Sequence, residues 1–168
     1  MKTRVLKAVV FIYSLVTLLS GCYTFQGNRI DPQIETVTIN YFPNQSNFVA
    51  TSLSQTFTET LKNKFASETR LYLKDNDGDW EYSGAITQYV STPIAPTGNE
   101  TTALNRLTIG VKVDFVNHKN EKENWSQTFS RFEDYPSTQS LSTVENDLIQ
   151  RISLQLADDI YLKSASDW

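Results

Sequence analysis

Few side chains in this sequence of 168 residues have the types and spacing that chemistry requires. The chain has one cysteine and one histidine, which excludes disulfide frameworks, multi-cysteine metal clusters and the paired histidines of an H-E-x-x-H zinc site. The histidine, His118, lies in a polar stretch where a solvated loop side chain is the ordinary outcome. A Ser or Thr nucleophile therefore lacks a positioned base. The sequence predicts that the protein is no enzyme and needs no metal or cofactor.

The carboxylates are also poorly placed for catalysis or metal binding. Segment 75–79 alternates aspartates around Gly78, but an EF-hand loop would need its first acid where Leu73 stands, so we expect a hairpin turn there. The acidic pairs at 133–134 and 158–159 are sequence neighbours, which point in different directions on a strand or a helix. Neither pair is expected to converge on a substrate.

The lone cysteine ends a segment typical of export. Three basic residues and the apolar run 8–19 precede Leu19-Ser20-Gly21-Cys22. The run is too short to span a bilayer and has the length of a signal-peptide core. The four residues resemble the bacterial lipobox, whose cysteine receives acyl chains such as palmitate. We expect residues 1–21 to be a lipoprotein signal peptide and Cys22 to be lipidated.

The residues after Cys22 favour the periplasmic side of the outer membrane. Tyr23 stands where some bacteria use Asp to retain lipoproteins in the inner membrane, and no acidic run follows it. Without the three basic residues of 1–21, 12 Lys and Arg remain against 19 Asp and Glu, a net charge of −7. This balance opposes nucleic-acid binding.

Hydrophobic periodicity predicts the elements that carry these residues. The alternating segment 34–42 is a strand, residues 48–65 have apolar positions every four residues, as in an amphipathic helix, and 71–73 is a short strand. Trp80, Tyr82, Ile86 and Val90 are expected on one face of the next strand. A loop, 91–102, leads to a strand alternating through 108–115, and the polar loop 118–122 leads to its partner, which ends before Pro136. The capping box Ser142-Thr143-Val144-Glu145 starts a terminal helix.

These elements predict an α+β fold. The order is β-α-β-β-β-β-α, and two amphipathic helices are available to cover one face of a sheet. We expect a two-layer sandwich with both helices on one face of a mixed, mostly antiparallel sheet. Residues 22–33 would form a lipidated tether and 34–168 a single domain. The other sheet face and the loop 91–102 remain free for a partner.

Three basic residues near the central strands are candidates for binding an anionic headgroup. Lys112 and Arg131 could share a surface, and Arg106 could lie close to Arg131 across the antiparallel pair. Two guanidinium groups side by side would bind a phosphate bidentately. The alternative is that they are solvated charges paired across the strands with Asp114 and Glu133.

The whole chain resembles the LptE family of lipopolysaccharide-assembly lipoproteins. The stretches that carry the resemblance are Ile39–Asn44, Ser52–Glu59, Leu104–Ile109, Gln127–Phe132, the helix from Ser142 and the closing Asp167-Trp168. The resemblance is to the form of the family found in lineages distant from the enteric bacteria.

The resemblance implies a binding role in which no bond is broken. LptE-like proteins plug the LptD barrel, assist its assembly and bind lipopolysaccharide during its transfer to the outer leaflet. Their basic residues lie in the loop between the long strands and near the last helix, but 91–102 and 137–147 contain no Lys or Arg. Any lipopolysaccharide contact is therefore expected at Arg106, Arg131 and Lys112.

The long loop is the expected contact with the barrel. It lies at the tip of long strands, where it reaches furthest from the tethered end, and its candidate contact residues are Pro93, Pro96, Thr97 and Asn99. The alternative function is a periplasmic scaffold lipoprotein of another envelope-assembly complex, without lipopolysaccharide contact.

Overall fold

The structure is a computed structural model that describes residues 30–48, 50–95 and 103–165. Its elements are β1 (Thr36–Ile39), α2 (Leu53–Glu68), β2 (Tyr72–Leu73), β3 (Trp80–Ile94), β4 (Leu104–Asn117), the 3-10 turn η1 (Glu121–Glu123), β5 (Trp125–Pro136) and α3 (Leu141–Ala165). In this part of the chain no helix combines the length and apolarity needed to cross a membrane.

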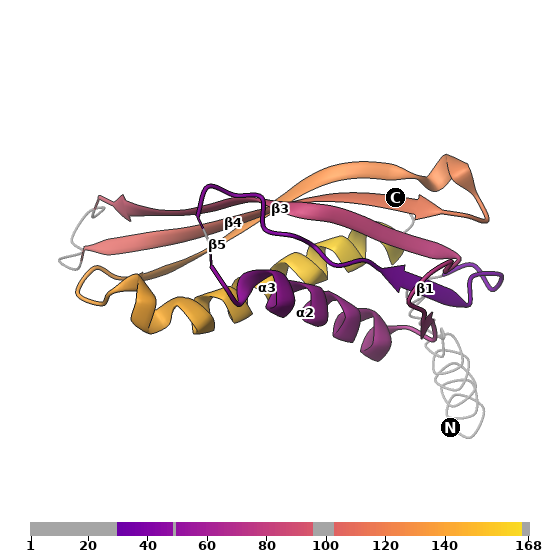
Figure 1. The fold of residues 1–168 in the computed structure, drawn as a ribbon, viewed down its shortest axis with the longest axis horizontal. Helices are drawn as coiled ribbons and strands as arrows, with labels where there is room; N and C mark the ends of the chain where they lie inside the picture. Colours follow the sequence, from indigo (N-terminus) through magenta and orange to yellow (C-terminus); the bar gives the residue numbers. More distant parts are fainter. Residues whose placement is uncertain (1–29, 49, 96–102, 166–168) are drawn as a thin grey trace, which may run out of the picture.

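The elements form two layers, a five-stranded sheet and a pair of helices (Figure 1). The strand order is β2-β1-β3-β4-β5, with β1 parallel to both of its neighbours and β3, β4 and β5 antiparallel. Both helices lie on one side of the sheet. The predicted α+β sandwich with a mixed, mostly antiparallel sheet is confirmed.

The apolar positions that predicted the helices form the core. The stripe of α2 and the stripe of α3 are both buried, and they meet the inward side chains of β4, such as Ile109 and Val111. The helical members of this core are Leu53, Phe57, Leu61, Phe65, Leu148, Ile149, Ile152, Leu156 and Ile160. Burial of each such side chain contributes roughly 1.5–3 kcal/mol. This packing holds the helices on the sheet.

The first helix starts later than the sequence pattern predicts. Asn44 accepts hydrogen bonds from the backbone N–H and hydroxyl of Ser46, at 3.0 and 2.6 Å, and donates to the carbonyl of Phe48 at 2.9 Å. Such side-chain bonds offer the backbone an alternative to the helix. They hold 44–48 as a loop, and α2 begins only at Leu53.

The long strands reach further into the expected loop than predicted, and a bulge changes their phase. β3 continues to Ile94, which pairs with Leu104 of β4. The register shifts between Ile86 and Gln88, so one extra residue reverses the faces beyond it. Tyr89 is therefore buried and Val90 is exposed. The prediction that Val90 shares the inward face of Tyr82 and Ile86 is wrong.

A glycine in β3 lets the loop after β1 pack against the sheet. Gly84 has a φ of +149°, and a Cβ there would lie 2.0 Å from the carbonyl oxygen of Lys112 and 2.9 Å from the ring of Phe42. Phe42 is fully buried and makes an edge contact with Phe57 of α2. A side chain at Gly84 would displace Phe42 from this position.

Two further local predictions are wrong. The segment 74–79 is no hairpin turn, because β2 and β3 lie on opposite sides of β1 and both run parallel to it. The capping box does not start α3, because Leu141 already precedes Ser142 in the helix. Glu145 instead accepts a 2.5 Å hydrogen bond from the hydroxyl of the buried Tyr89, which ties α3 to β3.

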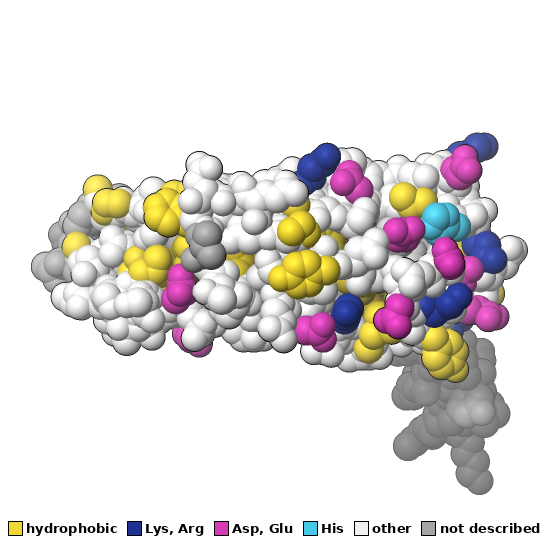
Figure 2. All heavy atoms as spheres, in the orientation of Figure 1, with side chains coloured by type: hydrophobic (Ala, Val, Ile, Leu, Met, Phe, Trp, Pro, Cys, Tyr) yellow, Lys and Arg dark blue, Asp and Glu magenta, His cyan; other side chains and the backbone are white. Residues whose placement is uncertain are grey.

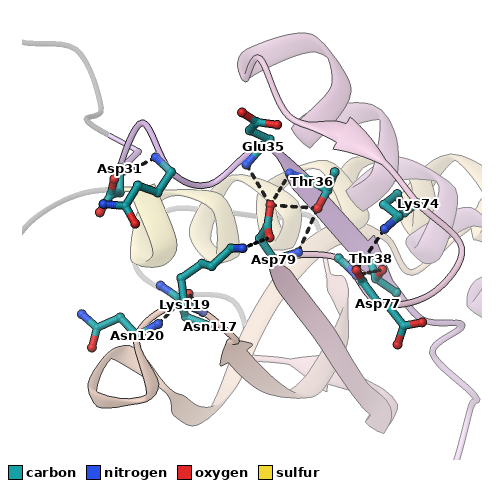
Figure 3. Close-up of polar contacts among 12 residues, drawn as sticks. Asp31, Glu35, Thr36, Thr38, Lys74, Asp77, Asp79, Asn117, Lys119 and Asn120 are labelled. Carbon is teal, nitrogen blue, oxygen red and sulfur yellow. Dashed lines mark hydrogen bonds and ion pairs between the residues drawn. The ribbon is translucent and has the colours of Figure 1, made fainter.

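Asp79, just before β3, joins the start of the domain to the turn between β4 and β5 (Figure 3). Its carboxylate accepts hydrogen bonds from the backbone N–H groups of Glu35 and Thr36, each at 3.0 Å, and from the Thr36 hydroxyl at 2.9 Å. Lys119, in the turn between β4 and β5, lies 3.1 Å from its other oxygen. These donors, chiefly the Glu35 N–H, hold the pKa of Asp79 well below its usual range.

We expect Asp79→Asn to lower the free energy of unfolding at pH 7 by about 1.5–3 kcal/mol, the size of a hydrogen bond to a charged group. A lowered folded-state pKa contributes stability above the unfolded value of about 3.9, and this contribution is lost as the pH falls below it. Urea unfolding at pH 7 and pH 3 should therefore show a smaller difference from the wild type at pH 3. Asp75→Asn, which removes a charge from an exposed turn, is the control. If both variants lost the same free energy of unfolding at pH 7, the stabilising role assigned to the Asp79 carboxylate would be contradicted.

Candidate functional site

The side of β3, β4 and β5 that faces away from the helices is not covered by any other described element (Figure 1). We call it the open face. Its side chains form rows across the three strands, of which the four nearest the β3–β4 tip are Gln88–Gly110–Ser130, Val90–Thr108–Phe132, Thr92–Arg106–Asp134 and Ile94–Leu104–Pro136. Most of these residues are exposed or half-buried. The rows carry hydroxyl, amide and apolar groups with a single pair of charges.

Arg106 and Asp134 supply that pair of charges. The Arg106 Nε and Nη2 atoms donate to the two carboxylate oxygens at 2.7 and 2.9 Å, and the guanidinium carbon lies 3.6 Å from the centre of the Phe132 ring. The hydrogen bonds from Arg106 lower the pKa of the Asp134 carboxyl. Arg106 is thus an ordered, neutralised cation that stacks on an aromatic ring.

Lys112 also lies on the open face, nearer the β4–β5 turn. Its ammonium lies 3.7 Å from the carboxylate of Asp114, two residues along the same strand, and both side chains are about half exposed. Asp114 in turn accepts a hydrogen bond from the hydroxyl of Ser126. Lys112 thus pairs with Asp114 as an ordinary surface charge, but within one strand and not across strands as expected.

Arg131 lies on the opposite face of the sheet from Arg106 and Lys112. It is opposite Ile109, an inward residue of β4, and its guanidinium donates two hydrogen bonds of 2.5 Å to Asp159 of α3. The expected joint phosphate clamp of Arg106 and Arg131 is therefore wrong, because the sheet separates them. The alternative, in which Arg131 pairs across the strands with Asp114 or Glu133, is also wrong for Arg131, because Arg131 and Glu133 both face α3 and find partners there. Lipopolysaccharide binding by Arg106, Arg131 and Lys112 individually stays a prediction.

The expected barrel-contact loop is described only at its start. Pro93 lies in β3 opposite Asn105, near the tip of the long strands. Pro96, Thr97 and Asn99 lie outside the described residues, as does the lipidation site Cys22. The first described residue, Ile30, lies at the other end of the sheet, where its carbonyl accepts a hydrogen bond from Arg70.

We call these two ends the near end, around Ile30 and the β4–β5 turn, and the far end, around Ile94 and Leu104. Strand β3 has 15 residues, and at about 3.3 Å per residue it spans about 45 Å. Figure 2 shows Lys, Arg and His side chains gathered toward the near end, while the visible side of the far end carries mostly hydrophobic and uncharged groups. A chain tethered at the near end would present the far end at a distance.

The described residues offer no arrangement for catalysis. They contain no cluster of three metal-binding side chains. His118 is half exposed, with its Nε2 atom 3.0 Å from a carboxylate oxygen of Glu81, and no hydroxyl nucleophile contacts it.

Two carboxylates, Asp79 and Asp134, make contacts that the sequence pattern did not predict. Asp79 has partners 43 and 44 positions away, and nothing local marks such a contact. The partner of Arg106, Asp134, could have been found by pairing the two strands through the turn at 118–124, because this register places them opposite one another.

Comparisons with known proteins agree on the fold. The family model described as "LptE: Lipopolysaccharide-assembly" matches residues 34–164. A structure of rare lipoprotein B from Shewanella oneidensis is similar with a TM-score of 0.50 and 15% identity, covering 78% of this chain and 94% of that one. A structure from Xanthomonas campestris has a TM-score of 0.51 and 9% identity, covering 79% and 88%. No curated protein matches the chain in sequence.

We expect Arg106→Ala to raise the pKa of Asp134 toward its ordinary value of about 3.9, because both hydrogen bonds from the guanidinium are lost. Arg131→Ala should leave that pKa unchanged, since Arg131 lies on the other side of the sheet. An NMR titration of the Asp134 carboxyl carbon measures both. A similar rise in the two variants would mean that the arginines share a surface.

Proposed function

Because the chain belongs to the LptE family, we propose that it is a non-enzymatic outer-membrane lipoprotein that plugs an LptD-like β-barrel and assists lipopolysaccharide transport to the outer leaflet. The match to the lipopolysaccharide-assembly family over nearly the whole described domain is the observation that carries this proposal. The barrel partner and the membrane anchor are the finer parts, and each is supported by separate features.

Lipidation of Cys22 would anchor the protein at its near end. Cys22 ends the lipobox-like segment, and residues 22–33 would connect it to the domain. Arg70 donates hydrogen bonds to the carbonyls of Ile30 and Asp31, so the tether would meet the domain at a defined place. Two or three acyl chains on one cysteine suffice for stable anchoring.

The open face is the surface that we propose enters the barrel. The lumen of an outer-membrane barrel is polar, and the open face presents Thr, Ser and Gln side chains with its charges already paired. Such a surface exchanges water for polar groups without leaving an unpaired charge buried. The far end, with Pro93 and the residues 96–102, would penetrate furthest.

Lipopolysaccharide phosphates would find Arg106 and Lys112 on this face and Arg131 on the other. Each cation already has a carboxylate partner, so a phosphate would compete with Asp134, Asp114 or Asp159. We therefore propose that the barrel-plug role dominates and that contact with lipopolysaccharide is made by single cations. The alternative scaffold in another envelope complex would need neither contact.

We expect a photocrosslinking amino acid at Thr97 or Asn99 to capture a large β-barrel protein in outer membranes, since these positions follow the far end of β3. The same amino acid at Asn120, in the β4–β5 turn at the near end, is the matched control and should capture less of it. Mass spectrometry of the crosslinked band identifies the partner. Capture of the barrel at Asn120 alone would contradict the proposed orientation, and no barrel under mild detergent would favour the scaffold alternative.

A further inference from the structure

Among the residues that the structure describes, the sheet has three edges without a neighbouring strand, and two of them are protected against pairing with another strand. β2 has only two residues. β3 has no described strand beside it beyond Ile86, but this stretch contains the bulge at 86–88 and Pro93. Short strands, bulges and prolines are the devices by which proteins block their edges.

The third edge, β5, lacks these devices. It has 12 residues, pairs with β4 along its length without a shift of register, and contains no lysine and no proline before its last position. Its first half, Trp125–Ser130, carries no charge. The charges that follow are held within the molecule, Arg131 by Asp159 and Asp134 by Arg106. Alternate N–H and C=O groups of such a strand point outward and need a backbone partner or water.

A shallow groove of about 570 Å³ runs along this edge. Five consecutive residues of β5, 127–131, line one side of it, and Asp159, Leu162 and Lys163 of α3 line the other. Successive side chains of a strand point to opposite faces, so five consecutive residues can share a groove only where it follows the backbone edge itself. The groove therefore has room beside the backbone groups that another strand would use.

The charges at this groove select among possible strands. Asp159 neutralises Arg131, whereas Lys163 forms no ion pair with any residue that the structure describes and is exposed. The groove thus keeps one positive charge on its helix side. An acidic side chain on the helix-facing side of an added strand would complement it.

We propose that β5 binds an extended segment of a partner protein as a sixth strand. Backbone hydrogen bonds to Trp125–Arg131 would provide the affinity, and an acidic side chain opposite Lys163 would provide the specificity. The proposal rests on the edge, the groove and the charge, and it is independent of the lipopolysaccharide-assembly role. Its failure would leave that role unaffected.

The probe is a synthetic peptide of alternating Val and Thr with one central Glu, added to the full chain in detergent micelles. Hydrogen exchange followed by NMR should show alternate amides of 125–131 slowed about ten-fold or more at saturation. The same peptide with two adjacent central prolines should give no slowing, because neither of its edges can pair.

Two variants separate strand addition from general adhesion. Thr128→Lys places a guarding lysine beside the edge and should weaken binding about ten-fold. Thr92→Lys makes the same substitution at an exposed position of β3, so binding should be unchanged. Lys163→Glu should weaken binding of the Glu peptide and restore binding when the peptide carries Lys instead. Circular dichroism establishes that each variant is folded.

Several results would overturn the proposal. Unchanged exchange at 125–131 with saturating peptide would do so, as would slowing by the proline peptide or slowing confined to β3. Analytical sedimentation of the chain without peptide measures its oligomeric state. A dimer that Thr128→Lys dissociates would assign the edge to a second copy instead of a partner protein.

Discussion

The two-residue period of the three long strands is the constraint on which the rest of this structure depends. Only one side of the sheet is covered by helices, so every residue of β3, β4 and β5 belongs either to the core or to an exposed face. Beyond the bulge at 86–88, the residues of β3 that would face the core face outward and the reverse, so Tyr89 is buried and Val90 is exposed. A single register therefore determines which side chains can meet a partner.

The same constraint separates the charges by function. Arg131 faces α3 and fastens the edge strand to it, while Arg106 lies on the open face with Asp134 and Phe132. At the near end Asp79 ties the start of the domain to the β4–β5 turn, because its carboxylate collects donors from both. The near end is therefore fixed by several charged contacts, whereas the open face of the far end carries hydroxyl and apolar groups around one ion pair, Arg106 with Asp134. This asymmetry is what the proposed plug, tethered at one end, would need.

The sequence predicted the element order, the helix stripes and the one-sided sheet, because each depends on periodicity within one segment. It did not predict the bulge, because Thr87 is an ordinary strand residue by type. Only the register, which pairs Gln88 and not Thr87 with Gly110, shows that Thr87 is the extra residue. The prediction of a joint phosphate clamp by Arg106 and Arg131 was wrong, because the closeness of two residues along a hairpin does not determine which face of the sheet each side chain occupies. The prediction that the capping box starts α3 was wrong, and the Glu145 side chain instead accepts a hydrogen bond from Tyr89 of β3. The open edge of β5 is visible in the uncharged stretch Trp125–Ser130, once the strand is known to be terminal.

The proposed function requires the open face at the far end to meet the barrel. Thiol-labelling rates of single cysteines at Thr92, on that face, and at Ser67, exposed on α2, test it most directly, compared between the lipoprotein alone and its complex in outer membranes. We expect the complex to slow labelling at Thr92→Cys by about ten-fold or more, because the barrel would exclude the reagent, and to change Ser67→Cys little. Unchanged labelling at Thr92→Cys, or protection of Ser67→Cys alone, would contradict the account.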